Sequence, residues 1–323
     1  MNTTGFAKAD VEGKNIAERA DLARQLGRFL SLEKPQAERT AVEQLALVMA
    51  TDSELKVRKI LVEELRTCRF IPAELAKKIA DDIEDVAGPF LLDTELLALE
   101  TLEEIAYQCG DGARQILARR AHLPEPVSFV ITEVGEEKAV GNLMANPTAE
   151  MSERVCLKVN QRFAESDEIM ERLTERADLP LSVIDVLIHR IADRWRDHLI
   201  QNYNLGPDFA SYIWGQTRSK ALIEAIKAAK EPERLAYLKR VEGEGGLEGD
   251  LILQMLQQGE INCFKLAMAV RARAPLANIE IILADHSDLA FERLLEKAGI
   301  GSALAPIFAS TFKEKAGIAT EAN

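Results

Sequence analysis

The sequence Arg-Arg-Ala-His-Leu-Pro-Glu-Pro-Val at residues 119–127 returns in altered form as Arg-Ala-Asp-Leu-Pro-Leu-Ser-Val at 176–183. A looser copy, Met-Ala-Asn-Pro-Thr-Ala-Glu-Met-Ser, occupies 144–152, and Arg-Phe-Ile-Pro-Ala-Glu-Leu at 69–75 is an earlier form. Each copy ends one apolar run, turns at a proline and opens another apolar run at helical spacing. Because proline in the first helical turn loses no hydrogen bond and its φ suits the helix, the phrase predicts a junction between two helices.

The spacing of these phrases predicts a repeat array. Pro72, Pro124 and Pro180 alternate with Asp93-Thr94 and Asn146-Pro147, which gives a unit of roughly 20–30 residues. A unit this short cannot bury its own apolar stripe, so neighbouring units must cover it. Aromatic residues are only 5% of the chain, and this scarcity together with abundant Ala, Leu and Glu favours helices over strands. The sequence therefore predicts an all-α solenoid built from helix pairs.

One segment resembles the second helix of HEAT repeats. Asp52 is followed by Val57-Arg58, Val62 and Leu65 at the spacing of that signature. In HEAT proteins the Asp and the Arg contact neighbouring repeats and hold the stack together. The resemblance implies the same role here for Asp52 and Arg58, within a HEAT-like α-solenoid that ends in a small C-terminal helical cap or bundle.

Four runs of sequence together resemble a bacterial family, domain of unknown function 2336. These runs lie at 116–128, 132–140, 143–152 and 175–183. The sequence departs from the family pattern at His122 and Ala177, which stand near its usual prolines, and at Val134, where its Thr-Gly-Asp turn differs. The resemblance covers roughly residues 20–315. It implies an all-helical, HEAT-like architecture in a soluble bacterial protein of alphaproteobacterial type, and it implies no activity.

Composition shifts along the chain predict five segments. Residues 1–20 read as a loosely ordered N-terminus, 21–200 as the repeat array and 201–240 as a helical connector containing aromatic residues. The Gly/Glu-rich segment 241–250 predicts a hinge, and 251–323 a C-terminal helical subdomain. Apolar spacing in that subdomain predicts five short helices, at Leu251–Leu256, Phe264–Val270, Ile279–Leu283, Leu289–Leu295 and Leu304–Phe312.

Charge and cysteine content limit the compartment and the partners. The net charge of −13 disfavours nucleic acid and anionic membranes as partners, because the mean field repels phosphate. Residues 1–20 contain no apolar core of signal-peptide length, and no run of apolar residues is long enough to span a bilayer. The four cysteines form no Cys-x-x-Cys pair, which is typical of buried thiols in a reduced compartment. We therefore expect a cytoplasmic protein.

The sequence contains no recognised catalytic motif. Only four histidines are present, none of them lies in a His-Glu-x-x-His motif, and the sequence contains no Gly-x-Ser-x-Gly elbow. His189, Asp193 and Asp197 fall on one helix face as a candidate half-site for a metal, but neighbouring arginines make a solvated, salt-bridged face the favoured interpretation. The glycines of 243–249 superficially match a phosphate loop, yet the interleaved carboxylates would repel the anion. We expect no enzyme, no metal and no cofactor.

Two groups of residues are candidate binding sites. The first is a basic strip that would suit a phosphate or carboxylate ligand, formed by Arg114, Arg119, Arg120, His122 and Arg154. Salt bridges between repeats, to Glu125, Glu133, Glu136, Glu137 and Glu153, are the favoured alternative for that strip. The second is an aromatic cluster that would serve as a docking surface or hold two subdomains together, formed by Tyr203, Phe209, Tyr212 and Trp214.

These observations support one main hypothesis and two alternatives. The main hypothesis is a non-enzymatic interaction scaffold or adaptor that binds a protein partner or its own copy. The alternative is a sensor in which the basic strip binds a small anion, such as a nucleotide second messenger, while the segment 241–250 closes the C-terminal part upon it. An enzyme acting on nucleic acid is disfavoured by the acidic charge.

Overall fold

A computed structural model describes residues 11, 13–32, 34–94, 97–203, 207–285 and 287–315, with backbone only for 195–203 and 207–214. Within these residues the chain forms 19 helices and no strand, which confirms the all-α prediction. The chain divides into two compact units, one ending at Leu179 and the other beginning at Pro180.

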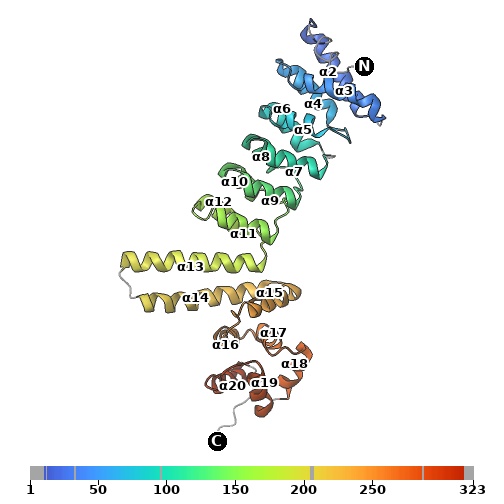
Figure 1. The fold of residues 1–323 in the computed structure, drawn as a ribbon. Coiled ribbons are helices and arrows are strands. Elements are labelled where there is room, and N and C mark those ends of the chain that lie inside the picture. The colour runs from blue at the N-terminus through green and yellow to red at the C-terminus, as the bar shows by residue number, and fades with distance from the viewer. Residues whose placement is uncertain are drawn as a thin grey trace. The chain divides into compact units, whose positions relative to one another are not determined.

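The first unit is a two-layer stack of helices (Figure 1). The even-numbered helices pack against one another in one layer and the odd-numbered helices in the other. From Leu55 onward the even helices begin at residues 55, 84, 111, 137 and 167, so a repeat is 26 to 30 residues long, as the proline spacing predicts. The helices are α2 (Ile16–Leu30), α3 (Gln36–Met49), α4 (Leu55–Leu65), α5 (Ala73–Ala80), α6 (Glu84–Asp93), α7 (Leu99–Gln108), α8 (Asp111–Leu117), α9 (Glu125–Val134), α10 (Glu137–Met144), α11 (Glu153–Arg162) and α12 (Asp167–Thr174).

The recurring phrase is the loop that joins an even helix to the next odd helix. Its proline lies one position earlier than expected: Pro35, Pro72 and Pro124 are the N-caps of α3, α5 and α9, with ψ between 136° and 148°. The N-cap residue has extended backbone geometry, which the fixed φ of proline also suits, and its carbonyl accepts the first helical hydrogen bonds. The carbonyl of Pro124, for example, accepts from the N–H groups of Val127 and Ser128.

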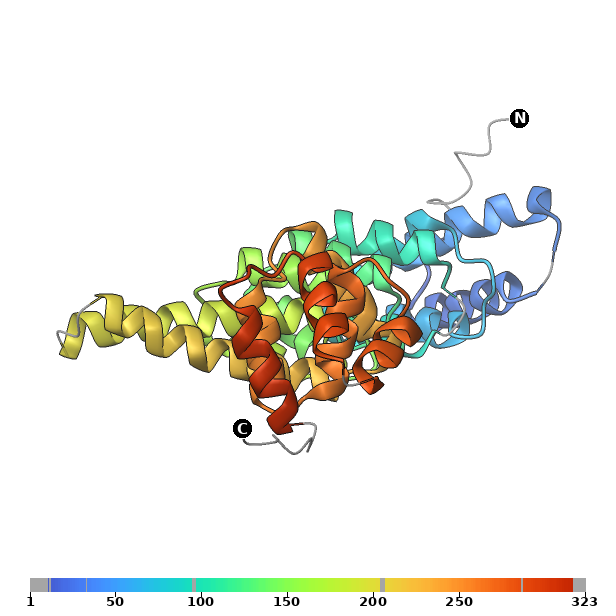
Figure 2. The ribbon, with the colours of Figure 1, turned by 90° about the horizontal axis from the view of Figure 1, so that it is seen from below.

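The second unit begins with two long helices, α13 (Leu181–Tyr203) and α14 (Pro207–Ala228), which pack side by side as an antiparallel hairpin in both views (Figures 1 and 2). The remaining helices are α15 (Glu231–Gly243), α16 (Gly249–Gln257), α17 (Ile261–Arg271), α18 (Leu276–Ala284), α19 (Asp288–Lys297) and α20 (Ala305–Lys315). The last five confirm, one for one, the short helices predicted from apolar spacing.

Aromatic side chains fill the centre of this second unit. Phe264 and Phe308 are fully buried, with ring centroids 6.3 Å apart, and Phe291 stacks on Phe312 at 5.2 Å. Of the predicted hinge segment 241–250, residues 241–243 belong to α15 and residues 249–250 to α16. Residues 244–248 join the two helices beside this core, and Leu247 is fully buried. No helix in the described part of the chain is both long and apolar enough to cross a membrane.

Candidate functional site

The residues of the predicted basic strip lie on successive repeats, and each arginine contacts other parts of the protein. Arg114 on α8 donates from Nε to the Ala106 carbonyl at 2.7 Å, at the end of α7. Arg119 contacts Glu84 of the preceding even helix, with 2.6 Å between Nη2 and Oε1. Both cations thus stabilise neighbouring helices.

Arg120, His122 and Arg154 have different surroundings. Arg120 is only 8% exposed and donates to the carbonyls of Leu91 and Thr94. His122 is exposed with φ of 51°, and its backbone N–H donates to Thr148. Arg154 binds both carboxylate oxygens of Glu125, at 3.0 and 2.9 Å, and its guanidinium lies 4.0 Å from the centre of the Phe129 ring.

The contacts therefore follow the pattern of bridges between repeats. Arg154 with Glu125 and Lys158 with Glu133 both join α9 to α11. Burial acts to raise the pKa of Glu125, but hydrogen bonds from Arg154 and Ser152 together with the Arg154 charge lower it below its ordinary value. An anion at the predicted strip would have to compete with these carboxylates, and anion binding stays a prediction.

A feature that sequence reasoning missed is a ladder of buried polar side chains, which we call the loop ladder. Five even helices have a fully buried leucine in their last turn, and the side chain of the third residue after each one is buried too. The leucines are Leu65, Leu91, Leu117, Leu143 and Leu173, and the residues of the loop ladder are Cys68, Thr94, Arg120, Asn146 and Arg176.

Most members of the loop ladder donate to backbone carbonyls of the preceding loop. Arg120 donates to the Thr94 carbonyl at 2.8 Å, Asn146 to the Arg120 carbonyl at 2.7 Å, and Arg176 to the Asn146 carbonyl at 2.7 Å. Cys68 donates to the Leu30 carbonyl at 3.1 Å. Carbonyls at helix ends have no partner within their own helix, so these bonds satisfy groups that stacking would otherwise bury unpaired. The regular spacing of these leucines, 26 residues between each of the first four and 30 before the last, is the signal that could have revealed the ladder.

A second chain of contacts lies at the opposite ends of the even helices. Arg19 on α2 donates to Asp52 at 2.8 Å, and Arg58 on α4 contacts Asp82 ahead of α6 at 2.5 Å. Arg58 also donates to the Asp52 carbonyl at 2.7 Å. Asp52 and Arg58 therefore join three consecutive even helices, as their resemblance to HEAT repeats implies.

The other predicted residues fall in the second unit. Tyr203, Phe209, Tyr212 and Trp214 belong to α13 and α14, but their side chains lie outside the described residues, as does that of Asp197. His189 Nδ1 lies 2.9 Å from Asp185 Oδ1, one turn earlier on α13. Among the described side chains, no three His, Cys, Asp or Glu residues gather closely enough to hold a metal ion.

The remaining candidates for a chemical role are the four cysteines and the glycine-rich segment 243–249. All four cysteines are buried, and burial raises the pKa of Cys109 and of Cys156 to about 11, so both thiols stay protonated at neutral pH. In the glycine-rich segment, Gly245 has φ of 76° and the Gly246 N–H donates to the Val241 carbonyl at 2.9 Å. This turn closes the end of α15.

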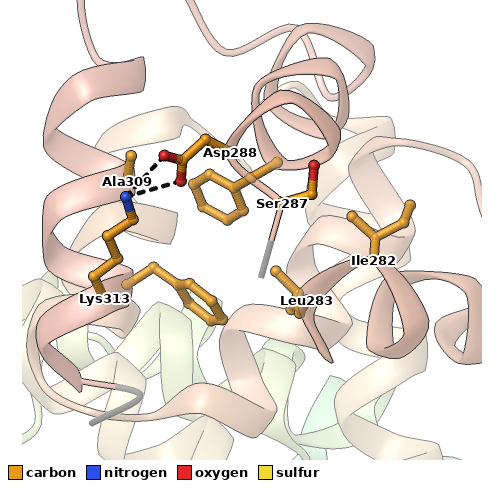
Figure 3. A pocket seen from close by; sticks show the side chains of 8 residues that line it. Ile282, Leu283, Ser287, Asp288, Ala309 and Lys313 are labelled. Atoms are coloured by element: carbon orange, nitrogen blue, oxygen red, sulfur yellow. Dashed lines mark hydrogen bonds and ion pairs between the residues drawn. The ribbon is translucent and has the colours of Figure 1, made fainter. Parts of the chain in front are cut away.

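Three hollows are candidate ligand sites. One of them is too small for a ligand, and the arginines of another are already engaged by the protein. The cavity between α18, α19 and α20 measures about 30 Å³, which is room for little more than a water molecule. Figure 3 shows the ion pair of Asp288 with Lys313 at its rim. A groove of about 530 Å³ beside α10 and α12 contains Arg172 and Arg176, but both donate to carbonyls and to carboxylates of the same unit.

The third hollow is a groove of about 260 Å³ in the first unit, which we call the Phe70 groove. It lies between the start of α3 and the loops that precede α5 and α7. Its lining is part apolar, from Phe70, Ile71, Pro72, Leu97 and Ala98, and part polar, from Gln36, Arg39, Glu43 and Arg69. None of the five basic-strip residues lines any of these three hollows.

Comparison with known proteins places most of the chain in one family. The model of a family described as "uncharacterised protein conserved in bacteria (DUF2336)" matches residues 86–322. The match begins later than the resemblance suggests, because α2 to α5 lie outside it. Searches of curated proteins and of solved structures found no significant match.

Proposed function

Because the chain belongs to this uncharacterised bacterial family, DUF2336, we propose its function from its own geometry: it is a non-enzymatic scaffold of the bacterial cytoplasm that binds a protein partner. One observation carries the proposal. Four of the large apolar side chains exposed in the first unit, Leu32, Phe70, Leu92 and Leu99, lie in or directly beside the loops between even and odd helices.

Those loops recur in every repeat, and side-chain hydrogen bonds fix their backbone. The loop ladder donates hydrogen bonds to the backbone of the loops that follow α2, α6, α8 and α10, and Arg39 donates to the Phe70 carbonyl in the loop that follows α4. Apolar side chains displayed on a rigid backbone favour association, because little conformational entropy is lost on binding. The buried polar side chains Arg120, Asn146 and Arg176 are engaged by backbone carbonyls inside the stack, which supports a binding role over catalysis.

The test is cross-linking in the native bacterium with the full-length, tagged chain, followed by mass spectrometry. The purified chain is measured beside it by light scattering to obtain its solution mass. We expect a reproducible cross-linked partner, or a mass of two or more copies, with cross-links that map to the first unit. A monomeric mass together with no cross-linked protein would contradict the scaffold.

A further inference from the structure

The Phe70 groove has the build of a docking site for one protruding side chain. Phe70 is 66% exposed, although its backbone carbonyl accepts a hydrogen bond from Arg39 Nη2 at 2.5 Å. Arg39 is itself buried and also donates to the carbonyls of Leu30 and Leu32. The aromatic ring is thus presented to solvent from a fixed loop, as interface anchors are.

One of the two arginines that line the groove, the buried Arg39, is already neutralised. Arg39 Nε lies 3.3 Å from Glu43 Oε1, and the remaining guanidinium nitrogens are engaged by the three carbonyls. An acidic ligand would find no free partner in Arg39. This disfavours an anion bound at Arg39.

The apolar surface is confined to the early repeats. Phe70 stands five residues after the last leucine of α4. In the sequence, the same position is Leu96 in the next repeat and is polar in the three repeats after that: His122, Thr148 and Asp178. If this loop position had only a structural role, we would expect it to be either apolar or polar in every repeat of the array. The change to polar residues indicates that the first loops display their apolar side chains for a separate reason.

A row of carboxylates without partners accompanies this apolar surface. Glu38, Glu74 and Glu100 lie in the first turns of α3, α5 and α7, are exposed, and make no ion pair or side-chain hydrogen bond with any described residue. The first-turn carboxylate of α9, Glu125, is by contrast bound to Arg154. The net charge of the first unit is also negative, since residues 1–179 contain 34 of the 53 acidic residues but only 23 of the 40 basic ones.

We propose that the Phe70 groove docks a basic segment of a partner protein. The segment places an aliphatic or aromatic side chain against Phe70, and its Lys or Arg side chains lie near Glu38, Glu74 and Glu100. This inference rests on the proposed scaffold function and identifies the chemistry of its partner.

The test is fluorescence anisotropy of the full chain with the labelled peptide Gly-Lys-Arg-Lys-Leu-Trp-Leu-Lys-Arg-Lys-Gly. One comparison peptide replaces Leu and Trp by Ser, and another replaces Lys and Arg by Glu. We expect the basic apolar peptide to bind and both comparison peptides to bind at least about tenfold more weakly. No binding of the basic apolar peptide, or stronger binding of the acidic one, would overturn the proposal.

Matched variants separate the groove from general attraction to an acidic protein. Phe70→Ser should weaken binding about tenfold, while Tyr107→Ser, at an aromatic that is 64% exposed at the end of α7, should change it less than about twofold. The triple variant E38Q/E74Q/E100Q should weaken binding and flatten its salt dependence. The triple variant E231Q/E292Q/E296Q removes the same charge from exposed positions in the second unit, and an equal loss there would refute the groove.

The same variants distinguish failure of this inference from failure of the scaffold. If Phe70→Ser leaves the cross-linked partner in the bacterium unchanged, the groove assignment is wrong and the scaffold stands. If the wild type captures no partner and is monomeric, the scaffold itself fails. Circular dichroism should show unchanged melting for Phe70→Ser, because the side chain is exposed.

Discussion

At the scale of single residues, the loop ladder shows how burial decides what a polar side chain contributes. Asn146 satisfies the carbonyls of Ala118 and Arg120, whereas the hydroxyl of Thr94 is buried and has no hydrogen-bond partner among the described residues. An unpaired buried polar group costs free energy, while a paired one is approximately neutral or favourable. Two positions of the same ladder should therefore respond to substitution in opposite ways.

Asn146→Ala should lower the free energy of unfolding by about 2 kcal/mol, because two buried carbonyls lose their donors. Thr94→Val should leave stability unchanged or raise it by up to about 1 kcal/mol, because it removes the unpaired hydroxyl and keeps the shape. Urea unfolding followed by circular dichroism measures both. The exposed Asn278→Ala serves as the control.

Adjacent arginines offer a second comparison. Arg120→Met should destabilise by about 2–3 kcal/mol, because the buried carbonyls of Leu91 and Thr94 lose a charged donor. Arg119→Met should cost less than about 1 kcal/mol, since its pair with Glu84 is exposed. If Arg119→Met proved the more damaging variant, the ladder would not be the stabilising element described above.

Buried thiols predict how stability depends on alkaline pH. Burial raises the pKa of Cys109 and Cys156 from 9.0 to about 11, so the folded state keeps protons that the unfolded state releases. Their contribution is complete below pH 9 and is lost as the pH rises to about 11, by up to about 1.4 kcal/mol per pH unit for each thiol. In urea titrations between pH 8 and 11, the double variant C109A/C156A should show a flatter decline than the wild type.

At the scale of helices, two ion pairs join α4 to α6 in different surroundings. Arg58 and Asp82 are both mostly buried, with side chains 15% and 12% exposed, whereas Lys59 and Asp85 are largely in solvent. Exposed pairs are screened by water and salt, and partly buried pairs are screened less.

A double-mutant cycle to alanine on Arg58 and Asp82 should give a coupling free energy of about 1–3 kcal/mol. The cycle on Lys59 and Asp85 should give a clearly smaller coupling that falls further in high salt. Equal couplings would mean that the contact from Arg58 to the Asp52 carbonyl, and not its pair with Asp82, holds α4 in register.

Helices were also the level at which sequence reasoning succeeded best. Apolar spacing located α16 to α20 because a helix between two close neighbours must bury a stripe, and the stripe is visible in the sequence. The target of Arg120 was not visible, because the Thr94 carbonyl becomes its neighbour only when two loops stack. Arg119 and Arg120 look alike in sequence, yet one is exposed and the other buried. The sequence therefore predicts a basic strip on the surface, although one of its members, Arg120, is buried.

At the scale of the whole molecule, the two compact units have separate cores. The core of the second unit is built from its own residues, among them Phe264 and Phe308, and the first unit has the stacked leucines of its even helices. Each unit contains enough buried apolar surface to be expected to fold alone.

Residues 1–179 and 180–323, produced separately, should each give a helical circular dichroism spectrum with a cooperative thermal transition. The sum of the two spectra should reproduce that of the intact chain. An unfolded fragment would show that its core depends on the other unit.

The donors of the loop ladder all point one way along the chain. Cys68, Arg120, Asn146 and Arg176 each supply a hydrogen bond to a loop that precedes them in sequence. A nascent chain leaves the ribosome from its N-terminus, so each of these four loops gains its donor when the next repeat emerges. The array can thus close during synthesis one repeat at a time, with each loop waiting only for the repeat that follows it.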